Sequence, residues 1–156
     1  MAERSVYSCF LLATVVATVA VGCSREFSGP CLPQDLSDEY GLLLNVDTFF
    51  GAHVGFGGIT PPAVLAFRVL LDDPRGDYLF KSLVCKATIP GRLYGLAGIY
   101  FTDPAAFERE IELYLESCGM VKTMFGCIVA DQEIRVIAER ILRGELPAEL
   151  AGIVKP

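Results

Sequence analysis

Frequent helix-breaking signals constrain this sequence more than any other feature. Between residues 60 and 144, apolar segments with helical spacing are separated by Pro74 with Gly76, Pro90-Gly91, Asp103-Pro104 and Gly119. Proline cannot continue a helix interior, and glycine suits the left-handed position after a helix. Because the breaks are short, consecutive helices should lie antiparallel beside one another. The pattern predicts a mainly α domain, built as an irregular bundle or a short stack of about five helices.

The predicted helices cover residues 60–73, 77–87, 91–101, 103–118 and 131–143. The first is apolar nearly all round, so it should be the most buried, with Arg68 as its main solvent-facing residue. Thr60 is its expected N-cap, as Asp77 and Asp103 are for later helices. Residues 120–129 are rich in β-branched and aromatic side chains around Gly126 and predict a short extended segment or hairpin. The tail after residue 144 should pack through leucines.

Three glycines recur on one face of the predicted helix 91–101. Gly91, Gly95 and Gly98 are spaced at i, i+4 and i+7, which places them on the same side of a helix. Each internal glycine lowers intrinsic helix stability by about 1 kcal/mol. We therefore expect the missing side chains to let another backbone pack closely against this face.

The composition of the N-terminal region predicts an export signal. No charged residue occurs from Ser5 to Ser24, and the stretch from Phe10 to Gly22 is rich in Leu, Val and Ala. A secretory signal has such a short apolar middle, followed by small residues at its cleavage site. The apolar stretch here ends at Cys23.

The sequence Ala20-Val21-Gly22-Cys23 resembles the lipobox of bacterial lipoproteins. In that family a diacylglyceryl group is attached to the cysteine thiol, the signal is cleaved before it, and the new amine is often acylated. The resemblance covers the first 23 or so residues and implies that Cys23 is lipidated, with palmitate-like chains. Two or three chains would hold the protein on a membrane, since each buried methylene contributes about 0.8 kcal/mol.

The resemblance divides the chain into a signal peptide (1–22), a lipidated cysteine with its tether (23–38) and one mostly helical domain (39–156). The tether is polar and contains Pro30 and Pro33. Two other arrangements remain open. One is a cleaved signal without lipid. The other is an uncleaved membrane helix, because an uncharged span of about 20 residues just reaches across a bilayer.

Cysteine parity fits an oxidising compartment. The chain has six cysteines. Removal of the signal discards Cys9, and lipidation uses Cys23, which leaves an even number for disulfides. Cys118 and Cys127 would close a short loop, and Cys31 with Cys85 would tie the tether to the second predicted helix. Four cysteines allow three pairings, and a buried free thiol at Cys85 is the alternative.

The charge pattern excludes some partners. The formal net charge is −6, and the basic residues are scattered along the chain. Nucleic-acid binding requires a cluster of Lys and Arg to neutralise phosphates, so we expect no nucleic-acid partner. A polybasic membrane contact is also missing, which leaves lipid on Cys23 as the expected attachment to the membrane.

A glycine-rich segment, predicted to be an irregular or weakly extended loop, holds the single histidine, His53. A hydrolase would need it as a base beside a nucleophile, but the sequence has no nucleophile-elbow motif. Without a C-x-x-C motif, one histidine does not make an ordinary zinc site. The run Gly55–Gly58 lacks the lysine of a phosphate-binding loop. We predict no catalytic residue, metal or cofactor.

Four acidic residues are the alternative candidates for a glycosidase-type carboxylate pair. They are Glu39, Asp47, Asp72 and Asp73. Three aromatic residues near the glycine-rich segment, Phe49, Phe50 and Phe56, are candidates for a partner-facing patch, with ordinary core as the alternative. The sequence therefore predicts a non-catalytic envelope lipoprotein that contacts another protein. A small envelope hydrolase and a carrier of small apolar ligands are the alternatives.

Overall fold

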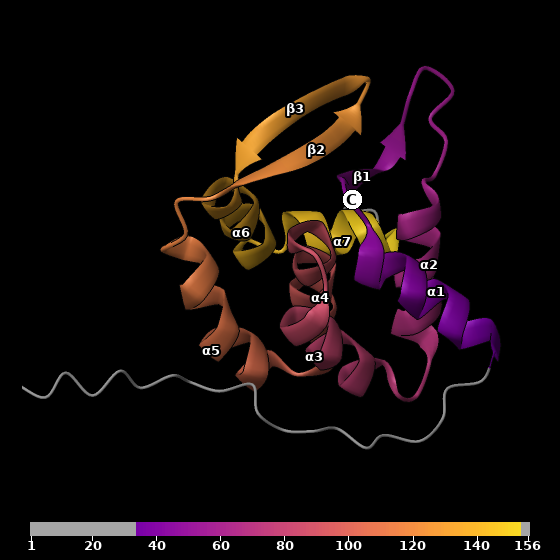
Figure 1. The fold of residues 1–156 in the computed structure, drawn as a ribbon, viewed down its shortest axis with the longest axis vertical. Coiled ribbons are helices and arrows are strands. Elements are labelled where there is room, and N and C mark those ends of the chain that lie inside the picture. The colour runs from indigo at the N-terminus through magenta and orange to yellow at the C-terminus, as the bar shows by residue number, and fades with distance from the viewer. Residues whose placement is uncertain (1–33, 154–156) are drawn as a thin grey trace, which may run out of the picture.

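A computed structural model describes residues 34–153, and side chains from residue 36 onward. This part of the chain forms a mainly helical fold with a small three-stranded sheet (Figure 1). The helices are α1 (Gln34–Asn45), α2 (Pro62–Asp72), α3 (Gly76–Lys86), α4 (Ile89–Thr102), α5 (Pro104–Leu115), α6 (Ile134–Leu142) and α7 (Glu145–Ala151). The strands are β1 (Phe49–Val54), β2 (Met120–Gly126) and β3 (Ile128–Glu133).

The mainly α class is confirmed, and the described residues hold seven helices rather than about five. The two additional helices are α1 and α7. The first begins at Gln34, inside the range assigned to the tether, and the second occupies the tail, where Leu146 and Leu150 are fully buried as expected. The signal peptide, Cys23 and Cys31 lie outside the described residues.

Side-chain capping explains where two of the helices begin. Asp103 accepts a hydrogen bond from the Ala106 amide at 3.0 Å, which confirms it as the N-cap of α5. Thr88 caps α4 by accepting from the Gly91 amide. The predicted cap at Thr60 is wrong, because α2 begins at Pro62 after an extended Pro61. Asp77 lies in the first turn of α3 rather than at its cap.

The glycine face of α4 packs against α3, as predicted. A Cβ on Gly95 would lie 2.9 Å from the carbonyl oxygen of Phe80, and one on Gly98 would overlap the Phe80 ring. A Cβ on Gly91 would overlap the carbonyl oxygen of Leu43 in α1. The small residues therefore bring α4 close to two neighbouring helices, and α4 occupies the centre of the fold (Figure 1).

The sheet has the order β1-β2-β3, with β1 parallel to β2 and β2 antiparallel to β3. The hairpin of β2 and β3 confirms the predicted extended segment. By contrast, the glycine-rich segment around His53, expected to be an irregular or weakly extended loop, begins within the strand Phe49–Val54. This strand forms because it pairs with distant residues, in the register Phe49 to Thr123. Tyr94 of α4 supports this strand, since its hydroxyl accepts from the Phe50 amide at 3.0 Å and donates to the Phe50 carbonyl at 3.2 Å.

The core lies between α4, the surrounding helices and one face of the sheet. Tyr94 packs at its centre against Phe49 and Phe67 with tilted rings, whose centroids lie 4.7 and 6.2 Å from that of Tyr94. Burial raises the pKa of the Tyr94 phenol. The tyrosine is fully buried with its hydroxyl paired, so it joins the helical layer to the sheet without leaving a polar atom unsatisfied.

Candidate functional site

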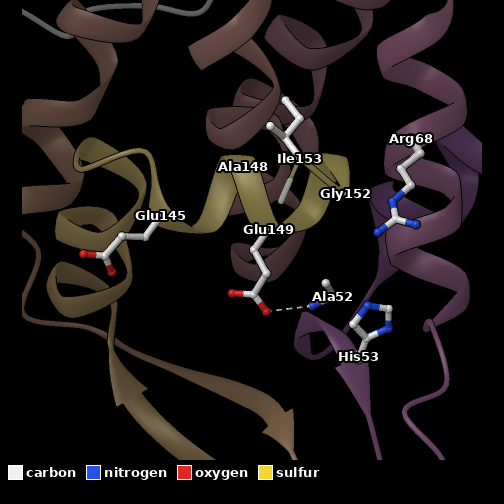
Figure 2. Close-up of a pocket in the computed structure, with 8 residues that line it drawn as sticks. All are labelled: Ala52, His53, Arg68, Glu145, Ala148, Glu149, Gly152 and Ile153. Carbon is white, nitrogen blue, oxygen red and sulfur yellow. Dashed lines mark hydrogen bonds between the residues drawn. The ribbon is translucent and has the colours of Figure 1, made fainter. Parts of the chain in front are cut away.

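An open groove of about 530 Å³ lies between β1, α2 and α7 (Figure 2). Its volume is within the range of small-molecule sites in proteins. The lining residues are Ala52, His53, Arg68, Glu145, Ala148, Glu149, Gly152 and Ile153. In the close-up, Arg68 and His53 lie on one side of the groove, and Glu145 and Glu149 lie on the other.

Two glycines in left-handed conformation place α7 along the groove. Gly144 and Gly152 precede and follow the helix with φ of 71° and 76°, a conformation that glycine adopts without strain. Gly144 lies directly after Arg143, the C-cap of α6, where a glycine ends the preceding helix. The short helix is then joined to β1, because Glu149 accepts a hydrogen bond from the Ala52 amide at 3.2 Å.

Arg68 connects α2 to the C-terminal end of α7. Its Nε donates to the carbonyl oxygen of Leu150 at 2.7 Å. Such a bond satisfies one of the carbonyls left open at a helix end, and the positive charge complements the helix dipole there. Arg68 is half-buried, so the prediction that it marks the solvent-facing side of the helix is only partly right. Within residues 34–153 it forms no ion pair.

The two groove glutamates are already compensated by arginines of the α6 region. Glu145 lies 2.7 Å from Arg143 and 3.6 Å from Arg140, and the hydrogen bond from Arg143 holds the pKa of Glu145 below its usual value. Glu149 lies 3.8 Å from Arg140, whose guanidinium also covers the ring of Phe125 at 4.6 Å. Of the described charged residues in the groove, Arg68 is therefore the one with no opposite charge within 4 Å.

His53 lines the groove but does not form a catalytic arrangement with the other described residues. It is exposed, and its Nδ1 lies 3.4 Å from the Thr60 hydroxyl, a long contact for a hydrogen bond. The four acidic candidates lie elsewhere. Glu39 borders a smaller groove between α1 and α2, Asp73 pairs with Arg75 at 2.9 Å, Asp47 accepts from Thr48, and Asp72 ends α2.

The aromatic candidates separate into three environments. Phe49 is fully buried in the core, and Phe50 is half-buried against it. Phe56 is fully exposed, at the turn after β1. The predicted patch of three aromatics is therefore wrong as a unit, because alternate residues of a strand point to opposite faces and the turn carries Phe56 away from both.

The structure contradicts the predicted Cys118–Cys127 pairing, since both are exposed, free cysteines. The seven residues of β2 separate them. A strand of that length extends about 23 Å, whereas a disulfide requires Cα atoms within about 7 Å. Cys85 is disulfide-bonded. Its predicted partner, Cys31, lies outside the described residues, so the Cys31–Cys85 pairing stays a prediction.

Sequence reasoning identified His53 in the groove and missed the carboxylates of α7. It singled out Arg68, an arginine within an otherwise apolar helix, without assigning it a ligand.

Comparison with protein-family models, curated proteins and solved structures found no match for this chain. No helix among the described residues is long and apolar enough to cross a membrane. Within the same residues, no group of three or more His, Cys, Asp or Glu side chains is placed to hold a metal ion.

Proposed function

We propose that this protein is an exported envelope lipoprotein, anchored through lipid on Cys23, whose helical domain is a non-catalytic module that contacts another protein. The lipobox-like sequence before Cys23 and the long uncharged stretch preceding it support the anchor. The observation that carries the interaction role is a projecting apolar surface, which we call the apolar tip. It consists of Phe56, Ile59, Ile128 and Val129.

The apolar tip is formed by two turns that lie side by side. The amide of Gly55, after β1, donates to the carbonyl of Gly126 at the β2–β3 turn at 2.9 Å. Both glycines have positive φ, as the tight turns require. Figure 1 shows both turns at the same end of the molecule, away from the start of α1. In an anchored protein whose tether leads into α1, this end would be free to meet a partner.

The composition of the apolar tip indicates the chemistry of its partner. Phe56 is fully exposed, and Ile59, Ile128 and Val129 are exposed by 69%, 71% and 55%. Residues 54–60 and 124–130 include no charged side chain, although 21% of the chain is charged. Exposed apolar side chains gathered around two neighbouring turns, with no charged residue among them, are typical of an interaction site. The partner surface is therefore an apolar, uncharged groove on a protein, since a charged surface would lose solvation without gaining an ion pair.

Photo-crosslinking in the native host tests this interaction. Phe56→p-benzoylphenylalanine places the reactive group on the apolar tip, and the same substitution at Leu113, which is 66% exposed on α5, is the matched control. We expect one discrete adduct with a second protein species from position 56 and none from position 113. An adduct with a second copy of the chain, an adduct with lipid alone, or no specific adduct would contradict the proposal.

The second candidate is a small hydrolase, which the position of His53 in the groove favours. His53→Ala should abolish any hydrolase activity found in the purified protein. If an activity is found and survives this substitution, the histidine-dependent form of this alternative is wrong.

A further inference from the structure

We propose that the groove binds a terminal carboxylate joined to a small apolar group, with Arg68 as the residue that holds the carboxylate. The groove is separate from the apolar tip, and its chemistry does not depend on the lipid anchor. The inference therefore stands or falls independently of the proposed function.

Among the described residues, the guanidinium of Arg68 has hydrogen-bond donors left over, and they are directed into the groove. A guanidinium carries five N–H donors in a planar fork, and the structure assigns one of them, on Nε, to the Leu150 carbonyl at 2.7 Å. That bond fixes the orientation of the side chain, whose guanidinium points into the space between α7 and β1 (Figure 2). A guanidinium whose orientation is already fixed can bind a carboxylate through two parallel hydrogen bonds, and its side chain loses little further conformational entropy on binding.

The charges around the groove favour an anion with a single charge. Glu145 and Glu149 lie within 4 Å of Arg140 or Arg143, whereas Arg68 has no acidic partner among the described residues. Among the described residues that line the groove, Arg68 therefore carries the one positive charge with no carboxylate within 4 Å. A second negative charge on the ligand would approach the carboxylates of α7, so a monocarboxylate fits better than a dicarboxylate or a phosphate.

The remaining walls indicate the apolar part of the ligand. Ala52, Ala148 and Ile153 line the groove beside Arg68, and Ile153 is 54% exposed. A small aliphatic group would cover these side chains and lower the dielectric around the ion pair, which strengthens it. A free carboxylic acid and the C-terminus of a polypeptide share this chemistry, and the experiment below distinguishes them.

The binding test uses the full chain in a non-ionic detergent and observes methyl signals of Ala52, Ala148 and Ile153 by nuclear magnetic resonance. The probes are N-acetyl-leucine, its neutral amide, and an N-acetylated tetrapeptide that ends in leucine with a free carboxylate. Because Arg68 also binds the end of α7, Arg68→Lys is the main variant, since lysine keeps the positive charge and a donor. Arg109→Lys, on the exposed surface of α5, is the matched control.

We expect saturable shifts of the three methyl signals with N-acetyl-leucine and none with its amide. Loss of the bidentate fork in Arg68→Lys should weaken binding by about tenfold, and Arg109→Lys should leave it unchanged. Tighter binding of the tetrapeptide would identify a polypeptide C-terminus as the ligand, and equal binding a small free acid. Equal binding of acid and amide, unchanged affinity in Arg68→Lys, or no saturable shift would overturn the inference. The acid and amide comparison on the unchanged protein decides the question even if the variant fails to fold.

Discussion

Replacing Gly98 with alanine should destabilise the domain, although alanine is the better helix former. Gly98 lies on the face of α4 that packs against α3, and a Cβ at this position would overlap the ring of Phe80. That ring is fully buried and packs against Phe67, with centroids 5.3 Å apart. It cannot move aside without displacing other core side chains.

Two opposing contributions determine the size of the effect. Alanine gains about 1 kcal/mol in helix propensity relative to glycine. Overpacking a close-packed core costs about 1–3 kcal/mol, and the overlap with a ring that cannot rotate away places Gly98→Ala near the upper limit. We expect a net loss of about 2 kcal/mol in the free energy of unfolding, since the clash outweighs the propensity.

Gly41 in α1 provides the matched control, because a Cβ there meets no atom within 4 Å. Gly41→Ala should stabilise the protein by about 0.5–1 kcal/mol, since propensity acts alone. Urea denaturation followed by far-ultraviolet circular dichroism measures both variants. A Gly98→Ala variant as stable as the unchanged protein would refute the close packing of α4 on α3. Equal destabilisation by both variants would show that the loss in Gly98→Ala does not come from a steric clash specific to that position.

Three further predictions concern single interactions. Tyr94→Phe removes the acceptor for the Phe50 amide and should lower the free energy of unfolding by about 1–2 kcal/mol. Tyr114→Phe is the control and should lower it less, because the Tyr114 hydroxyl makes no hydrogen bond to the described residues. Equal losses of unfolding free energy in the two variants would contradict the role of Tyr94. The hydrogen bond from Lys81 lowers the pKa of Asp103, so its stabilisation is complete above the ordinary pKa of 3.8 and is lost as pH falls through the lowered value. Asp103→Asn keeps the helix cap but loses the charge. The variant should therefore be less stable than the unchanged protein at pH 7, and urea denaturation should show this difference in unfolding free energy shrinking below about pH 4. A difference that does not change with pH would be inconsistent with the ion pair. Maleimide labelling of the denatured, unreduced protein, followed by peptide mapping, should show modification of both Cys118 and Cys127. Complete protection of either thiol would contradict the structure.

The helices were the most predictable part of the fold, because their signals are local. Asp103-Pro104 predicted the start of α5, and the spacing of Gly91, Gly95 and Gly98 predicted the close approach of a neighbour. The strand β1 was not predictable in the same way. It is glycine-containing and short, and it is held by Tyr94 and by parallel pairing with residues near 123. Neither contact leaves a pattern in the neighbouring sequence.

The candidate site depended even more on distant contacts. His53 was identified because a lone histidine in a glycine-rich segment is conspicuous. The bond of Arg68 to Leu150 and that of Glu149 to Ala52 join residues far apart in the chain, so periodicity could not predict them. The prediction of a Cys118–Cys127 disulfide was wrong for a related reason. A small separation in sequence suggested proximity, but an extended strand between two residues holds them apart.

The most direct test of the proposed function is the intact mass of the mature protein purified from the membranes of its host, together with mapping of its N-terminal peptide. We predict a chain that begins at Cys23 and carries the mass of a diacylglyceryl group, with or without an added acyl chain on the amine. A mature chain that begins elsewhere and carries no lipid would contradict the lipoprotein assignment.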